Sequence, residues 1–113
     1  MKVLLTTLNT KYIHSSLAVR YLKNYCQDYN FDIYSQEFSI NENIEDITGI
    51  IYKSKADIVG FSCYIWNIEK ILIICQRLKK IKPEITIILG GPEVSFESKQ
   101  LMEENTFIDY IIK

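Results

Sequence analysis

The segment Asp57-Ile58-Val59-Gly60-Phe61-Ser62 decides the fold, because a nearly solid apolar run ends there in a small polar residue. A run of this kind predicts a buried strand of a parallel sheet. Similar runs rich in β-branched residues recur along the chain, and a helical pattern separates each run from the next. The predicted strands cover residues 2–7, 32–38, 57–62, 85–89 and 108–112.

Helical periodicity fills the gaps between these strands. Apolar residues share one helical face around 17–25, 44–51 and 68–78, and a less periodic helix is expected at 97–104. Asn43 and Asn67 stand where they would cap the second and third helices, and Pro83 should end the third helix. Alternating strands and helices predict βαβ units.

The second predicted strand alternates polar and apolar residues, which places it at an edge of the sheet. Right-handed crossovers then favour the strand order 2-1-3-4-5. The predicted fold class is α/β: one domain over residues 1–113, with a three-layer, flavodoxin-like (Rossmann-like) five-stranded parallel sheet and helices on both faces. Such a sheet binds ligands beyond the carboxyl ends of its strands, which points to loops 7–16, 62–67 and 90–95.

The composition narrows the class of partner. With 13 basic and 14 acidic residues the formal charge is -1, so neither a nucleic acid nor a membrane surface is the expected partner. No apolar run approaches ~20 residues and no signal peptide is present, so a cytoplasmic location is expected. Cys26, Cys63 and Cys75 form no C-x-x-C pair, and Cys26 and Cys75 are interpreted as small buried residues.

The loop after the first strand contains hydroxyl and amide groups but no glycine. It matches neither G-x-G-x-x-G nor G-x-x-x-x-G-K-[ST], which disfavours a nucleotide phosphate. His14 is the only histidine in the chain. It could ligate a metal, act in acid–base chemistry or help to cap the following helix.

The loops after the third and fourth strands hold the most unusual residues. The third strand continues as Ser62-Cys63-Tyr64-Ile65-Trp66-Asn67. Tyr64 and Trp66 would suit a flat, partly apolar ligand, although Trp66 could also pack into the core. The fourth strand continues as Gly90-Gly91-Pro92-Glu93, where two glycines suit a plain turn or the close approach of a ligand or another backbone segment.

Ser62 and the later Gly90-Gly91, both at strand ends, resemble the second half of the cobalamin-binding signature D-x-H-x-x-G, S-x-L, G-G. More closely, Asp57-Ile58-Val59-Gly60-Phe61-Ser62-Cys63-Tyr64 and Ile88-Leu89-Gly90-Gly91-Pro92-Glu93 resemble the amino-terminal cobalamin (vitamin B12)-binding domain of cobalamin-dependent radical S-adenosylmethionine proteins. That superfamily includes the anaerobic magnesium-protoporphyrin IX monomethyl ester cyclases. The resemblance covers essentially the whole chain.

The resemblance implies cobalamin as the cofactor and assigns its contacts. Ser62 would hydrogen-bond the nucleotide tail, and Gly90 and Gly91 would give the tail room. Tyr12, Tyr64, Ile65 and Trp66 would face the corrin, Glu93 or Asn67 would bond its amide side chains, and Asn9, Cys63 and Pro92 complete the predicted set. No lower axial histidine is implied, because D-x-H-x-x-G is absent.

The resemblance also implies a longer parent protein. The cluster motif C-x-x-x-C-x-x-C does not occur in the sequence, so a 4Fe-4S cluster and S-adenosylmethionine would belong to a radical S-adenosylmethionine domain that follows Lys113. This chain would be the cofactor-binding part, with that domain as its partner in the same polypeptide.

Several alternatives stay open at this point. A degenerate domain of the same fold could act only as a docking module, and a flavin carrier could use the hydroxyls of the first loop. A thiol enzyme could be built on Cys63 if a nearby helix amino terminus lowered its pKa. A phospho-acceptor receiver domain is disfavoured, because Thr6-Thr7 and Ser62-Cys63 stand where acidic residues are needed.

Overall fold

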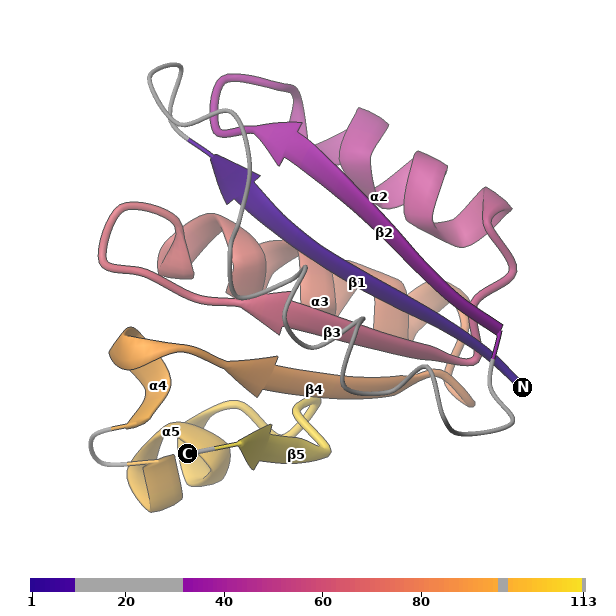
Figure 1. Ribbon diagram of the computed structural model, residues 1–113. Helices are drawn as coiled ribbons and strands as arrows, with labels where there is room; N and C mark the ends of the chain where they lie inside the picture. The colour runs from indigo at the N-terminus through magenta and orange to yellow at the C-terminus, as the bar shows by residue number, and fades with distance from the viewer. Residues whose placement is uncertain (10–31, 96–97, 113) are drawn as a thin grey trace.

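The sheet has the predicted number and order of strands (Figure 1). The computed structural model describes residues 1–9, 32–95 and 98–112. Its strands are β1 (Lys2–Asn9), β2 (Asp32–Ser39), β3 (Ile58–Ser62), β4 (Thr86–Gly90) and β5 (Tyr110–Ile112). Every neighbouring pair is parallel and the order is β2-β1-β3-β4-β5, which confirms the α/β class and the topology.

The helices of the described part are α2 (Ile44–Lys53), α3 (Ile68–Ile81), α4 (Pro92–Ser95) and α5 (Ser98–Glu104). Helices α2 and α3 lie side by side on the same face of the sheet (Figure 1). They confirm the second and third predicted helices, and α5 confirms the fourth, whereas α4 begins where only a loop was expected. The helix predicted at 17–25 falls outside the described residues. Among the described helices, none is long and apolar enough to cross a membrane.

The main core lies between the sheet and the pair α2 and α3. The strands contribute Leu4, Leu8, Val59, Phe61, Ile87 and Leu89, and the two helices contribute Ile47, Ile51, Ile71, Ile74 and Leu78. Fully burying one such side chain stabilises a fold by roughly 1.5–3 kcal/mol. On the opposite face the apolar side chains Leu5, Ile58 and Ile88 are only partly buried. Among the described residues, the fully buried apolar side chains of the strands therefore gather on the face that α2 and α3 cover.

The ends of the helices follow the sequence in two cases and depart from it in one. Asn43 caps α2 as predicted, because its Oδ1 accepts from the Glu45 amide at 2.7 Å. Helix α3 ends just before Pro83, also as predicted. Asn67 stands at the N-cap position of α3 as predicted, but its side chain makes no hydrogen bond to the first turn of the helix. Its actual partners belong to the candidate site.

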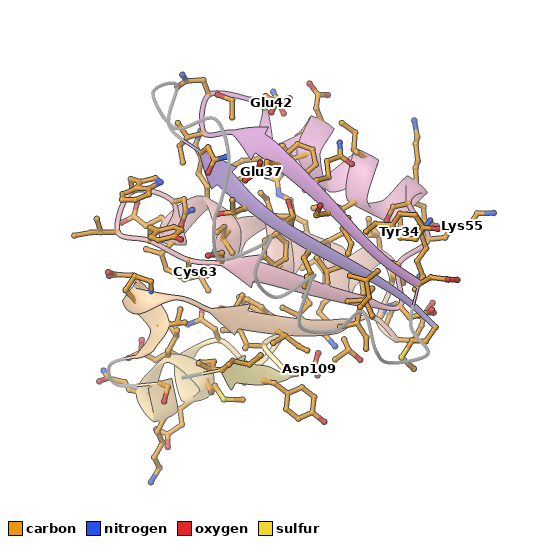
Figure 2. All side chains as sticks on the ribbon, in the orientation of Figure 1. Tyr34, Glu37, Glu42, Lys55, Cys63 and Asp109 are labelled. Carbon is orange, nitrogen blue, oxygen red and sulfur yellow. The ribbon has the colours of Figure 1, made fainter. Side chains whose placement is uncertain are left out.

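Two aspartates fix the amino ends of neighbouring strands. Asp57 Oδ2 accepts from the Lys2 amide at 2.8 Å, which ties the segment before β3 to β1. Asp109 Oδ2 accepts from the Ile87 amide at 2.8 Å and pairs with Lys79 Nζ at 2.8 Å (Figure 2). These contacts hold β1 against β3 and β4 against β5 at the edge opposite the candidate site.

Candidate functional site

All five strands point the same way, so their carboxyl ends meet along one edge of the sheet (Figure 1). Asn9, Ser62 and Gly90 are the last residues of β1, β3 and β4. Ser62 and Gly90 are paired across the ladder, so they present the same face of the sheet to any ligand. The structure thus brings together the two strand ends that the sequence singled out.

Ser62 carries a buried hydroxyl without a partner. The residue is 5% exposed, and in the part of the chain that the structure describes its Oγ makes no hydrogen bond. Among the described residues, Thr6 Oγ1 is the one other buried side-chain atom without a hydrogen-bond partner. Thr6 is paired with Phe61, so its side chain points to the core face. Ser62 follows Phe61 and points to the opposite face, because side chains alternate along a strand. An unmet buried hydroxyl costs about 1–3 kcal/mol, which a polar ligand group would offset.

The two glycines after β4 have different roles. Gly91 has φ of +103°, and a Cβ built on it would lie 2.5 Å from the carbonyl oxygen of Cys63 and 2.9 Å from its nitrogen. The close approach predicted at Gly91 is therefore made by the backbone of Cys63. A Cβ on Gly90 would make only ordinary contacts, at 3.8 Å from the oxygen of Ile112. Space for a ligand beside Ser62 thus lies at Gly90.

Cys63 does not have the properties of a nucleophile. Figure 2 shows it at the carboxyl end of β3, and its side chain is fully buried. Burial raises the pKa of its thiol to about 12; the backbone of Gly90 lowers this pKa and the charge of Glu93 raises it. The prediction of a lowered Cys63 pKa, which a thiol enzyme would need, is therefore wrong. Cys75 is likewise buried, and burial raises the pKa of its thiol.

The loop between β3 and α3 presents aromatic and apolar surface to solvent. The rings of Tyr64 and Trp66 stack at 4.6 Å between centroids and 1° between planes. Trp66 is 41% exposed and Ile65 is 77% exposed, so the alternative in which Trp66 packs into the core is wrong. Exposed apolar side chains grouped at the mouth of a site suit a ligand with a flat apolar face.

Asn67 is a buried connector within the site. It is 1% exposed; its Nδ2 donates to the Leu8 carbonyl at 3.0 Å, and its Oδ1 accepts from the Tyr64 amide at 2.8 Å. The sequence interpretation of a helix cap missed this role, as it missed Thr7, whose hydroxyl takes part in the same network. An asparagine in the loop three residues after Tyr64 was the available signal, because Asx side chains bond nearby backbone amides.

The other predicted residues lie around these. Asn9 is buried at the end of β1, and Pro92 and Glu93 are exposed at the start of α4. The Glu93 amide donates to the Cys63 carbonyl at 3.4 Å. Tyr12 and His14 lie outside the described residues. Within 1–9, 32–95 and 98–112, no cluster of three or more His, Cys, Asp and Glu side chains is placed to hold a metal ion.

A flavodoxin-like sheet with a buried unpaired hydroxyl beside a glycine, next to an exposed aromatic loop, defines a cofactor-binding α/β domain. Sequence comparison gives the particular family: the family described as "B12 binding domain" matches residues 3–113. The chain belongs to this family, and cobalamin is the cofactor that the membership assigns. The flavin carrier and the docking-only module are not favoured.

Two methyltransferases are similar to this chain. The cobalamin-dependent radical SAM methyltransferase TokK of Streptomyces tokunonensis is 24% identical over 81 residues, which are 72% of this chain and 12% of that protein. The 2-(S-pantetheinyl)-carbapenam-3-carboxylate methyltransferase of Streptantibioticus cattleyicolor is 23% identical over 56 residues, 50% of this chain and 8% of that protein. The matched part thus corresponds to a small fraction of each relative's length.

A solved structure supports the fold. The crystal structure of a cobalamin-binding protein from Desulfitobacterium hafniense DCB-2 superimposes with a TM-score of 0.74 and 14% sequence identity. The superposition covers 99% of this chain and 52% of that protein. At this identity the likeness concerns the fold alone, and it covers nearly the whole chain.

Proposed function

We propose that this chain is the amino-terminal cobalamin-binding domain of a longer radical S-adenosylmethionine methyltransferase. The family membership and the names of the two similar methyltransferases support this proposal. The partner in the proposal is the radical S-adenosylmethionine domain of the same polypeptide, which would hold the 4Fe-4S cluster and S-adenosylmethionine. When bound, cobalamin supplies the cobalt chemistry of methyl transfer.

The observation that carries the proposal is the buried, unpaired hydroxyl of Ser62 beside Gly90. A cofactor with a long polar tail fits this position, because Ser62 Oγ can donate one hydrogen bond and accept up to two. Gly90 leaves the adjacent space free of a side chain. The residues present therefore fit cobalamin at the strand ends.

The exposed loop would hold the flat part of the cofactor. Tyr64, Ile65 and Trp66 offer apolar surface on which a corrin can rest, and the exposed carboxylate of Glu93 can accept from its amide side chains. Tyr12 and Asn9 stay predicted contacts from the first loop. Since the sequence has no D-x-H-x-x-G, the proposal includes no protein imidazole on cobalt.

The test is a visible-absorbance titration of the purified chain with hydroxocobalamin. Removing the hydroxyl in Ser62→Ala should weaken binding about tenfold, since one buried hydrogen bond contributes roughly 1–1.5 kcal/mol. Thr6→Val is the matched control, because it removes the other unpaired buried hydroxyl on the opposite face. This control should bind as tightly as the unaltered chain.

The free energy of unfolding is measured for the same variants without cobalamin. Both substitutions remove an unmet buried hydroxyl, so neither should lower stability through a lost bond. Equal cobalamin affinity for Ser62→Ala and the unaltered chain would show that the tail lies elsewhere. If no cobalamin binds at concentrations up to about 1 mM, the proposed function is contradicted. A dissociation constant of about 1 mM corresponds to a binding free energy of only about 4 kcal/mol.

A further inference from the structure

The side chain of Asn67 joins the ends of two strands to the aromatic loop. Its Nδ2 group donates to the Leu8 carbonyl at 3.0 Å and to Thr7 Oγ1 at 3.2 Å, both at the end of β1. The Ser62 carbonyl, at the end of β3, lies 3.4 Å from the same nitrogen. All of these atoms are buried. Asn67 therefore connects the end of β1 to the end of β3, the strand that carries Ser62.

The other half of the amide holds the loop. Asn67 Oδ1 accepts from the Tyr64 amide at 2.8 Å, and the Asn67 amide donates to the Tyr64 carbonyl at 3.1 Å. The loop has little burial of its own, because Ile65 and Trp66 are exposed. Its start is fixed separately, since the Cys63 amide donates to the Gly90 carbonyl at 2.7 Å. The Ile68 amide also donates to the Tyr64 carbonyl at 3.0 Å, and Asn67 supplies the side-chain bond that ties the loop to β1.

Thr7 completes the network. Its hydroxyl accepts from Asn67 Nδ2 and donates to the Ser62 carbonyl at 2.7 Å, so a chain of hydrogen bonds runs from Asn67 through Thr7 to Ser62. Each buried bond in such a chain strengthens its neighbours. A shift of Asn67 would displace both the residue that carries the unpaired hydroxyl and the stacked pair of aromatic rings.

We propose that Asn67, together with Thr7, is a positioning residue of the cobalamin site, which sets Ser62 and the loop from Tyr64 to Trp66 in one fixed arrangement. This inference rests on the proposed function and reassigns Asn67, since its donors and its acceptor are engaged within the protein. An uncharged amide is required, because only an amide presents two donors and an acceptor in this arrangement. An aspartate would keep the acceptor for Tyr64 but turn a carboxylate toward the oxygens of Leu8 and Ser62.

The test uses the full chain and two isosteric variants. Asn67→Asp keeps the volume and removes the donors, and Thr7→Val removes the hydroxyl that relays to Ser62. Thr7→Ser restores that hydroxyl and is the conservative rescue. Asn105→Ala is the matched control, because Asn105 Nδ2 makes a comparable bond to the Leu101 carbonyl at 2.9 Å, outside the network.

Trp66 supplies a readout that needs no cofactor, since it is the one tryptophan of the sequence. Its fluorescence, its quenching by acrylamide and the near-ultraviolet circular dichroism of its stacked pair are measured first. Hydroxocobalamin is then titrated, and the dissociation constant and visible spectrum are recorded at a temperature where each variant is folded.

Asn67→Asp and Thr7→Val should both alter the Trp66 signals and weaken cobalamin binding by about tenfold or more. Thr7→Ser and Asn105→Ala should stay close to the unaltered chain in both. Unchanged Trp66 signals and affinity in folded variants would overturn the inference, as would an equal loss in Asn105→Ala. If Asn67→Asp does not fold, the pair Thr7→Val and Thr7→Ser decides it.

Failure of the proposed function gives a different result. In that case the unaltered chain retains no hydroxocobalamin, and the Trp66 signals alone decide whether Asn67 positions the loop. Altered signals in Asn67→Asp and Thr7→Val, with rescue in Thr7→Ser, support the positioning role. Unaltered signals in those variants overturn it.

Discussion

Among single residues, two hydroxyls and one thiol at the strand ends are buried, and burial acts on them in different ways. Ser62 Oγ lacks a partner and faces the candidate site, whereas Thr7 Oγ1 is bonded to the Ser62 carbonyl at 2.7 Å. The Cys63 thiol has only a long contact of 3.8 Å to the Phe61 carbonyl. Because it lacks a partner, Ser62 Oγ can bond a ligand. Burial, in contrast, keeps the Cys63 thiol protonated and unreactive.

The Cys63 thiol should resist alkylation in the folded protein. With its pKa raised from 9.0 to about 12, roughly one molecule in ten thousand carries the thiolate at pH 8. Iodoacetamide at pH 8, followed by peptide mass spectrometry, should label Cys63 slowly in the native chain and rapidly in guanidinium. Rapid native labelling would contradict the burial of this residue.

The same shift has a consequence for stability. Because the folded state favours the neutral thiol, Cys63 contributes stability below pH 9, and this contribution is lost as the pH rises through the window from 9.0 to about 12. Folding stability should accordingly fall in that alkaline window, and the fall should be smaller in Cys63→Ala.

At the level of elements, the end of α2 shows a mismatch between residue type and backbone conformation. Helix α2 ends at Lys53, and Lys55, two residues later, has φ of +61° (Figure 2). This left-handed conformation costs an L-residue about 1–2 kcal/mol and is usually taken by glycine after a helix. The Lys55 amide donates to the Tyr52 carbonyl at 3.2 Å, so the turn itself is well formed.

Replacing Lys55 with glycine should therefore stabilise the fold by up to about 1 kcal/mol. The matched control is Lys53→Gly, which places glycine in the last turn of the helix and should destabilise by about 1 kcal/mol. Urea unfolding followed by circular dichroism measures both. A loss of stability in Lys55→Gly as large as in Lys53→Gly would show that the left-handed turn is not strained.

Elements were predictable from sequence where local pattern decides them, and less so where a tertiary contact does. The apolar run that became β3 and the cap at Asn43 followed from pattern and residue type. Asn67 did not, because the same residue before a helix can bond the first turn or turn inward to a neighbouring strand. When Asn67 turns inward it bonds the Leu8 carbonyl at the end of β1, which is distant in sequence and therefore invisible to a local pattern.

For the whole molecule, the strand order followed from the handedness of βαβ crossovers, which restricts the topology before any contact is known. The topology in turn predicts a ligand site at the carboxyl ends of the strands. The identity of the group that approaches Gly91 could not be predicted, since a ligand and a backbone make the same demand for glycine. The structure assigns it to the backbone of Cys63, whereas a Cβ on Gly90 would make only ordinary contacts.

The central claim is that cobalamin binds across the carboxyl ends of β3 and β4. Amide hydrogen exchange of the full chain, with and without saturating hydroxocobalamin, tests it most directly. We expect slower exchange on binding in segments 62–67 and 90–93, and unchanged exchange in α2, which lies on the core face. Protection confined to α2 or to the amino ends of the strands, or no protection at saturation, would contradict the claim.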